Sequence, residues 1–290
     1  MIIGTRGSRL AITQADLASE AIQRLPGNIR PEIKVITTCG DRDRCTPLEE
    51  MGGYGVFTKE LDQRLLSDEI DLAVNSLKDM PSSLTPGTRL LAVLPRGPAC
   101  DVLVSKVPLE HLPPSSVVGT SSVRRKALLK HFRPDLQVAE LRGNITTRMN
   151  KWRRGDYQAI VLAEAGLDRL SDQTPRFSID PAIWVPPAGQ GVIALVCRDD
   201  DDRMNALSDL DHVPTRRCVD LEREVMKGLG ASCQVPIGVW AAPCPHGLDL
   251  RCLWLAADGS WAKRFERVVR EGDDMGALVE EIKRHWRWDG

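Results

Sequence analysis

Two hydrophobic patterns alternate along most of this chain. Short apolar runs bounded by polar residues predict buried strands, and apolar residues recurring every three or four positions predict helices. The predicted strands cover residues 2–3, 33–36, 72–74, 90–94, 117–119, 136–141, 159–162 and 192–196. The predicted helices include 58–66, 122–131, 145–154 and one that carries Leu10, Leu17, Ala21 and Leu25 on its apolar face. This alternation indicates parallel sheets covered by helices, which is an α/β fold.

The pattern changes near Thr215. A helix carrying Leu221, Val225 and Leu229 is followed by strands around Val239, at 250–255 and at 265–269, and then by a last helix near 275–285. The Pro- and Gly-rich segments 95–98 and 186–191 are typical of linkers. We therefore expect two α/β parts and a small C-terminal α+β part.

Composition excludes several classes of protein. The 290 residues carry a net charge of −1, with 42% hydrophobic and 27% charged residues, which is ordinary for a globular protein. No apolar run reaches the length of a transmembrane helix, and the first residues lack a signal-peptide core. We expect a cytoplasmic protein that does not bind membranes.

The eight cysteines form no C-x-x-C pair and predict no disulfide framework. Cys244 and His246 lie close in the sequence, but no second pair completes a zinc site, so we expect no metal. Cys233 differs from the others because it lies in the small-residue run Gly230-Ala231-Ser232-Cys233 just before Pro236. Such a thiol suits a covalent anchor on an open turn, although a small buried hydrophobe is the alternative.

Three predicted strand-to-helix junctions share one pattern. Each combines a capping residue with one or two arginines: Thr5-Arg6-Gly7-Ser8, Gly119-Thr120-Ser121-Ser122-Val123-Arg124-Arg125 and Arg142-Gly143-Asn144-Ile145-Thr146-Thr147-Arg148. Free backbone N–H groups gather at a helix start, and the arginine fork matches pairs of carboxylate or phosphate oxygens. In α/β sheets such junctions lie at the carboxyl ends of the strands. One junction alone is an ordinary capped helix, whereas three favour a ligand with several negative groups.

Residues 119–154 contain ten Lys or Arg residues against only Asp135 and Glu140, which invites a nucleic-acid interpretation. Phe132 and Trp152 are the only aromatic residues there, however, and proteins that bind single strands usually stack bases on aromatic rings. Arginines at helix starts suit separate carboxylates better than a continuous phosphate backbone. We therefore expect no nucleic-acid partner.

One acid stands out in the predicted loops near these arginines. Asp79, beside Lys78, follows the strand at 72–74, and a lone carboxylate among cations can stabilise a developing positive charge or move a proton. A structural cap or ion pair is the alternative. The glycine-rich loop at 52–55 lacks the lysine and spacing of a P-loop, so nucleoside triphosphate binding is excluded.

Taken in order, these motifs resemble the porphobilinogen deaminase family, also called hydroxymethylbilane synthases, almost from end to end. The matching segments are Thr5-Arg6-Gly7-Ser8, Gly52–Leu61, Ser76-Leu77-Lys78-Asp79, Gly119–Arg125, Leu141–Asn144, Gln190-Gly191 and Cys233–Gly238. The resemblance implies a dipyrromethane cofactor bound to Cys233 through a thioether. It also implies the head-to-tail joining of four porphobilinogen molecules with loss of ammonia, followed by hydrolysis that frees the linear tetrapyrrole.

The resemblance implies roles for individual residues. Asp79 would contact pyrrole N–H groups and stabilise the cation left when ammonia departs. The cofactor would be bound by Cys233, Lys78, Ser8, Thr120, Ser121, Ser122, Arg124, Arg125 and Arg142. The substrate carboxylates would be bound by Arg6, Arg148 and Arg169.

The resemblance also implies a fold: two domains like periplasmic binding proteins and a third that carries the cofactor. The expected domains are 1–94 with 190–210, 95–189, and 211–290. We expect a monomer.

The chain departs from the family pattern at four places. Tyr54 replaces a lysine, Asn75 replaces a histidine, Ala231-Ser232 replaces a glycine pair, and the segment 96–101 lacks the usual charges. We expect these changes to tune the enzyme without abolishing it. The rival interpretation is a non-catalytic binding paralogue for a polycarboxylate ligand, but a mere binding protein needs neither Cys233 nor Asp79.

Overall fold

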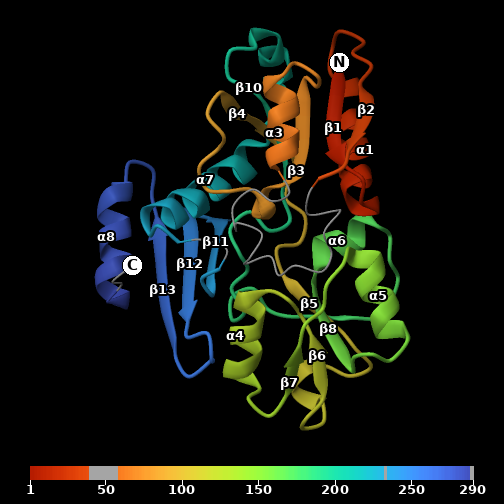
Figure 1. The fold of residues 1–290 in the computed structure, drawn as a ribbon. Coiled ribbons are helices and arrows are strands. Elements are labelled where there is room, and N and C mark those ends of the chain that lie inside the picture. Colours follow the sequence, from red (N-terminus) through yellow and green to blue (C-terminus); the bar gives the residue numbers. More distant parts are fainter. Residues whose placement is uncertain (39–57, 232–233, 288–290) are drawn as a thin grey trace. The chain divides into compact units, whose positions relative to one another are not determined.

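The computed structural model describes residues 1–38, 58–231 and 234–287 of the chain (Figure 1). The chain divides into two compact units, residues 1–97 with 191–217 and residues 98–190 with 218–290. The second unit therefore holds both the middle of the chain and its C-terminal part. The further division that we expect near residue 210 stays a prediction.

The first unit is built on a five-stranded sheet in the order β2-β1-β3-β10-β4. Its strands are β1 (Ile2–Arg6), β2 (Glu32–Ile36), β3 (Leu72–Ser76), β4 (Thr88–Val93) and β10 (Ile193–Arg198). Its helices are α1 (Arg9–Gln23) and α3 (Lys59–Leu66), with 3-10 turns η1 (Leu77–Asp79) and η3 (Asp202–Leu210).

The second unit contains a five-stranded sheet in the order β7-β6-β8-β5-β9 and a three-stranded antiparallel sheet, β11-β12-β13. The strands are β5 (Asp101–Val104), β6 (Val117–Gly119), β7 (Gln137–Ala139), β8 (Ala159–Ala163), β9 (Phe177–Ser178), β11 (Ile237–Cys244), β12 (Gly247–Leu255) and β13 (Ala262–Val269). The helices are η2 (Leu109–His111), α4 (Val123–Phe132), α5 (Ile145–Arg153), α6 (Glu164–Arg169), α8 (Met275–Trp286) and α7 (Val213–Gly228), which spans the boundary between the units.

The α/β class is confirmed, but the two large sheets are mixed rather than parallel. In each, three parallel strands (β2-β1-β3 and β7-β6-β8) are followed by an antiparallel strand, β10 in the first unit and β5 in the second. Both of these strands follow the segments predicted as linkers. No helix carries the chain across the sheet just before them, so they are free to run antiparallel.

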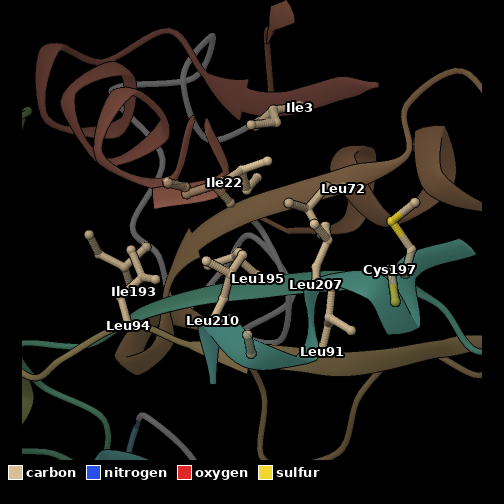
Figure 2. Close-up of a cluster of buried hydrophobic side chains, with 14 of the residues drawn as sticks. Ile3, Ile22, Leu72, Leu91, Leu94, Ile193, Leu195, Cys197, Leu207 and Leu210 are labelled. Carbon is tan, nitrogen blue, oxygen red and sulfur yellow. The ribbon is translucent and has the colours of Figure 1, made fainter. Parts of the chain in front are cut away.

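The core of the first unit lies between its sheet, α1 and η3 (Figure 2). Helix α1 forms where expected, but its predicted apolar face is only partly correct, since Ala21 and Leu25 pack against the core and Leu17 does not. Ala15, Ala18 and Ile22 are fully buried, whereas Leu17 is 37% exposed. Small alanine side chains let the helix backbone approach the sheet closely, and this close packing decides which face turns inward.

The small C-terminal sheet is covered on both faces within the second unit. One face packs with α7 and α8, and the other, through Leu253 and Leu255, joins the core that holds α4. Strand β11 lies directly against the segment around Pro186, because Val239 N donates to Pro186 O at 2.9 Å. A Cβ on Gly238 would come within 2.2 Å of Val185 O, so only glycine fits at this contact.

Strand β5 is one of the elements that the sequence pattern missed. Residues 95–98 were predicted as a linker with no strand directly after them, yet Asp101 opens β5 and is fully buried. Three apolar residues, Val102 to Val104, gave too short a run to distinguish from a loop.

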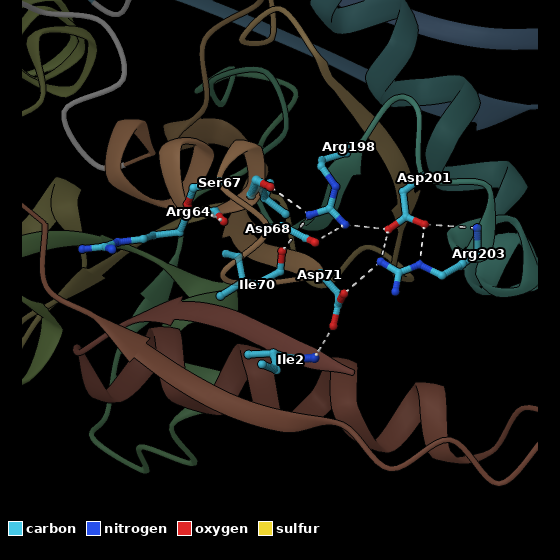
Figure 3. Close-up of polar contacts among 10 residues, drawn as sticks. Ile2, Arg64, Ser67, Asp68, Ile70, Asp71, Arg198, Asp201 and Arg203 are labelled. Carbon is cyan, nitrogen blue, oxygen red and sulfur yellow. Dashed lines mark hydrogen bonds and ion pairs between the residues drawn. The ribbon is translucent and has the colours of Figure 1, made fainter.

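A cluster of charged residues closes the edge of the first sheet where its parallel strands begin (Figure 3). Arg198 Nη2, at the end of β10, lies 2.8 Å from Asp201 Oδ2, and Arg203 Nε donates to Asp201 Oδ1 at 2.8 Å. Arg203 Nη2 also donates to Asp71 Oδ1 at 3.2 Å, and Asp71 Oδ2 accepts from Ile2 N at 2.7 Å. The cluster therefore joins the starts of β1 and β3 to the end of β10.

This cluster predicts a specific loss of stability in acid. Hydrogen bonds from Arg203, supported by Arg198, lower the pKa of Asp201 from 3.8 to about 2. A carboxyl whose pKa is lowered by folding stabilises the fold above its ordinary pKa, and this contribution disappears as the pH falls from about 4 to about 2. We expect Asp201→Asn to lower the free energy of unfolding by about 1–2 kcal/mol at pH 7, less than the full shift because the exposed Arg203 is screened by solvent.

Urea unfolding at several pH values checks this expectation. The difference between wild type and Asp201→Asn should shrink as the pH approaches 2. A difference that is the same at pH 7 and pH 2.5 would show that the charge of Asp201 does not stabilise the fold.

Candidate functional site

The first unit places two predicted binding segments at one edge of its sheet. Strands β1 and β3 are parallel neighbours, so the segments that follow them, Arg6 to Ser8 and Lys78-Asp79, lie at the same edge. Ser8 caps α1 as expected, because its side chain accepts from Ala11 N at 3.2 Å. Arg6 and Ser8 are half-buried.

Lys78 and Asp79 lie in the short turn η1 directly after β3. Asp79 is exposed and Lys78 is half-buried. Behind the turn, Ser76 and Gln14 form a reciprocal pair: Gln14 Nε2 donates to Ser76 Oγ at 2.9 Å, and Ser76 Oγ donates to Gln14 Oε1 at 3.1 Å. Gln14 is buried on α1, so this pair fixes the start of the turn to the helix that Ser8 caps.

Asn75, which stands where the family has a histidine, lies on β3 opposite Ala194 of β10. It is buried, and its Nδ2 has no hydrogen-bond acceptor within the described part of the chain. The expectation that Asn75 tunes the enzyme stays a prediction.

The second unit gathers the other two junctions at the corresponding edge of its sheet. Strands β6 and β7 are parallel neighbours, and their following loops are joined because Thr120 N donates to Ala139 O at 2.9 Å and Ser121 Oγ to Leu141 O at 2.7 Å. The predicted caps also form: Ser122 begins α4 and Asn144 begins α5, each accepting from a backbone N–H three residues later. The capping pattern of all three junctions is thus confirmed.

Three further arginines of the site prediction follow β7 and β8. Arg142, in the loop after β7, is half-buried, and so is Arg148, whose Nε donates to Gly143 O at 2.7 Å. Arg169 ends α6, which follows β8, the other parallel neighbour of β6. Burial lowers the pKa of Arg169, although Asp168 opposes this effect. The carboxyl edge of this sheet is therefore rich in guanidinium groups.

Arg124 and Arg125 are placed differently from surface arginines. Both are buried, 4% and 6% exposed, and both donate to the carboxylate of Asp101. Arg124 Nη2 reaches Asp101 Oδ2 and Arg125 Nη2 reaches Asp101 Oδ1, each at 2.6 Å. Their Nη1 atoms donate to backbone carbonyls, Arg124 to Val185 O at 2.9 Å and Arg125 to Val161 O at 3.1 Å.

Asp101 accepts from two further side chains. Trp184 Nε1 donates to its Oδ2 at 3.0 Å and Gln190 Nε2 to its Oδ1 at 2.9 Å. Burial would raise the pKa of Asp101, but Arg124 and Arg125 outweigh it and hold the pKa well below its ordinary value. Asp101 is therefore a buried carboxylate with four side-chain donors.

This carboxylate corrects one expectation. Asp79 was singled out as the one acid in the loops near the predicted arginines, whereas Asp101, at the start of a strand, is bonded directly to two of them. The sequence contained a signal, since an acid at the head of the apolar run Val102-Leu103-Val104 must find a partner when it is buried. Nothing in the sequence indicated that Trp184 and Gln190 would donate to this carboxylate.

Several residues of interest lie outside the described part of the chain, namely the glycine-rich loop at 52–55 with Tyr54, Ser232 and Cys233. The segment that leads to Cys233 leaves α7 through Gly230, whose φ of +62° is a left-handed conformation that glycine adopts readily. Ala231 is buried, and β11 begins at Ile237.

Residues 1–38, 58–231 and 234–287 contain no group of three His, Cys, Asp or Glu side chains placed to hold a metal ion. No helix in them combines the length and apolar character needed to cross a membrane.

Similarity over nearly the whole chain decides the family. Two family models match it: "Porphobilinogen deaminase, dipyromethane cofactor binding domain" over residues 1–206 and "Porphobilinogen deaminase, C-terminal domain" over residues 216–282. The chain belongs to the porphobilinogen deaminase family. The resemblance seen in the sequence is confirmed, and with it membership of a family of transferases whose cofactor-binding domain is formed here by residues 1–206.

Curated relatives agree with this assignment. The "Porphobilinogen deaminase" of Staphylococcus carnosus is 39% identical over 290 residues, covering 97% of this chain and 94% of the relative. The "Probable porphobilinogen deaminase" of Methanothermobacter thermautotrophicus is 38% identical over 281 residues, covering 95% and 96%. That of Archaeoglobus fulgidus is 43% identical over 245 residues, covering 83% of each chain.

Solved structures of periplasmic binding proteins are similar only at a low level. The methionine-binding protein MetQ has a TM-score of 0.44 and 11% identity, covering 72% of this chain and 89% of that chain. A TRAP periplasmic solute-binding protein from Desulfovibrio salexigens has the same score and identity and covers 72% and 71%. Scores at this level do not bear on function.

Proposed function

We propose that this member of the porphobilinogen deaminase family is a hydroxymethylbilane synthase. It joins four porphobilinogen molecules head to tail on a covalent dipyrromethane, releases ammonia at each addition, and frees the linear tetrapyrrole by hydrolysis. The family assignment supports this reaction. Porphobilinogen, with its acetate and propionate groups, is the substrate.

One observation in the structure carries the proposal. In each unit, the carboxyl edge of parallel strands presents capped helix starts together with arginines. Helix starts and guanidinium groups bind anions, and a growing chain of pyrroles adds two carboxylates with every ring. A set of separate anion sites fits this ligand better than a single deep pocket would.

The buried pair Arg124 and Arg125 fits a carboxylated cofactor. The Nε atoms of both are buried, and neither finds an acceptor among the described residues. A buried N–H without a partner costs about 1–3 kcal/mol, and a carboxylate oxygen would remove that cost. We propose that Lys78, Ser8, Thr120, Ser121, Ser122 and Arg142 bind the cofactor with this pair, and that Arg6, Arg148 and Arg169 bind substrate carboxylates.

Asp79 is proposed as the catalytic residue. Its exposed carboxylate lies in the turn η1, whose start is fixed by the hydrogen bonds between Gln14 and Ser76. A carboxylate held in place accepts from pyrrole N–H groups and stabilises positive charge that develops on the substrate as ammonia leaves. Fixing the turn reduces the reorganisation that this stabilisation requires.

Cys233 is proposed as the anchor that holds dipyrromethane through a thioether. When bound, the dipyrromethane supplies the free pyrrole position to which the first substrate is joined. The chain's own contribution is the thiol of Cys233, which the sequence places in a run of small residues between α7 and β11. We further propose a monomeric cytoplasmic enzyme with no nucleic-acid or membrane partner.

The proposal is tested on the purified wild-type chain. Its intact mass should exceed the sequence mass by one dipyrromethane, and porphobilinogen should be converted to a linear tetrapyrrole with release of ammonia. A binding paralogue would carry no adduct and form no product. An adduct without product formation would mark an enzyme that has lost turnover through its departures at Tyr54 and Asn75.

The nucleic-acid alternative is tested by titration with RNA and duplex DNA at physiological salt. Non-specific binding to phosphates weakens steeply as salt rises. Tight binding with such a dependence would overturn the assignment of the arginines to carboxylates.

A further inference from the structure

We infer that Asp101 is a positioning residue, which orients Arg124 and Arg125 and limits the buried pair to one net positive charge, so that it accepts a single carboxylate. The inference rests on the proposed function, because it concerns how the same arginines receive a pyrrole carboxylate. Asp101 itself touches no ligand and acts through the two guanidinium groups.

The geometry shows how the orientation is set. Asp101 opens β5, which is antiparallel to β8, so it lies at the edge where the loops after β6 and β8 emerge. There each carboxylate oxygen takes one guanidinium, at 2.6 Å in both cases. The second Nη of each arginine is held by a backbone carbonyl. With both ends fixed, neither guanidinium can turn without losing a charge-assisted hydrogen bond.

The surroundings of Asp101 keep the carboxylate itself from moving. Trp184 and Gln190 add one hydrogen bond to each oxygen. Trp184 is 1% exposed and its ring stacks on Phe132 of α4, with ring centroids 5.9 Å apart. The tryptophan thus packs on the same helix that carries both arginines, which ties the carboxylate of Asp101 to that helix.

Charge balance gives the second part of the inference. Two buried guanidinium groups face one buried carboxylate, which leaves a single positive charge. Buried charge is costly unless it is paired, so the group favours a ligand that brings one negative charge. A carboxylate matches this requirement. A phosphate dianion does not, because it would leave a second negative charge buried.

The variant Asp101→Asn distinguishes a positioning role of the Asp101 charge from a role in stabilising the fold. The amide keeps the shape but removes the charge, so we expect the fraction of chains carrying the adduct, and the rate of adduct formation at a given porphobilinogen concentration, to fall at least about tenfold. Inorganic phosphate should inhibit adduct formation in this variant at concentrations at least about fivefold lower than in wild type, because the pair now carries two positive charges.

Asp201→Asn is the matched control, since Asp201 is also a buried carboxylate between two arginines but lies at the edge where the strands of the first sheet begin. It should lose stability while keeping normal adduct formation and phosphate sensitivity. An equal loss of adduct in both variants would assign Asp101 to stability alone and overturn the inference. So would a folded Asp101→Asn chain with wild-type adduct formation or wild-type phosphate sensitivity.

Trp184→Phe covers the case in which Asp101→Asn does not fold. It removes one hydrogen bond to Asp101 and keeps an aromatic ring against Phe132, and it should raise the porphobilinogen concentration needed for half-maximal adduct formation about threefold. An unchanged concentration would overturn the inference. Wild-type chains that never acquire an adduct would instead overturn the proposed function, and this inference with it.

Discussion

Cys233→Ser should yield a folded protein that carries no pyrrole adduct and forms no tetrapyrrole. A serine hydroxyl is a far weaker nucleophile than a thiolate, so the thioether cannot form and no starting point for chain growth exists. Intact mass spectrometry of the purified variant measures the adduct directly. Circular dichroism and thermal unfolding show whether the fold persists.

Cys244→Ser is the matched control, because Cys244 is a free, half-buried cysteine on β11 and lies outside the small-residue run that holds Cys233. It should retain the full adduct and normal product formation. An adduct that persists in Cys233→Ser would place the anchor on another residue and refute the assignment.

Asp79→Asn should lower turnover by about a hundredfold or more, which corresponds to about 2.7 kcal/mol of lost transition-state stabilisation. The amide preserves the size of the side chain but cannot stabilise the positive charge that develops as ammonia leaves. Folding and the covalent adduct, if assembled, should persist. Single-turnover kinetics on chains that already carry the adduct separate the chemical step from assembly.

Asp16→Asn, on the exposed side of α1 in the same unit, is the control and should behave as wild type. An Asp79→Asn variant with normal turnover and a raised KM would assign Asp79 to substrate binding. Loss of the fold would assign it to structure.

Asp79 and Cys233 differ from Asp101 in how clearly the sequence indicates their importance. Asp79 and Cys233 stand out in the sequence because each lies in a short motif with its own chemical signal. Asp101 does not, since its importance depends on partners at positions 124, 125, 184 and 190, which only the folded sheet brings together. Its signal in the sequence is a single acid before a short apolar run.

Helix starts are the features that the sequence predicted best. Capping needs only a side-chain oxygen and a backbone N–H two or three residues later, so Ser8, Ser122 and Asn144 could be assigned from local spacing alone. Helix α1 shows the limit of this approach. Its existence followed from periodicity, but its buried face followed only in part, because Ala15 and Ala18 pack inward in place of the larger Leu17.

The sequence by itself determined the family, the alternation of strands and helices, the capped junctions and the residues proposed for chemistry. These features depend on local patterns, because hydrophobic periodicity, helix capping and the order of motifs can be read from residues close together in the chain. The tertiary structure alone decided the direction of β5 and β10, the face of α1 that is buried, and the partner of the arginines at the start of α4. These depend on contacts between residues far apart in the chain. The cost of burying the charge of Asp101 is offset only when donors from distant parts of the sequence bond to it in the folded protein.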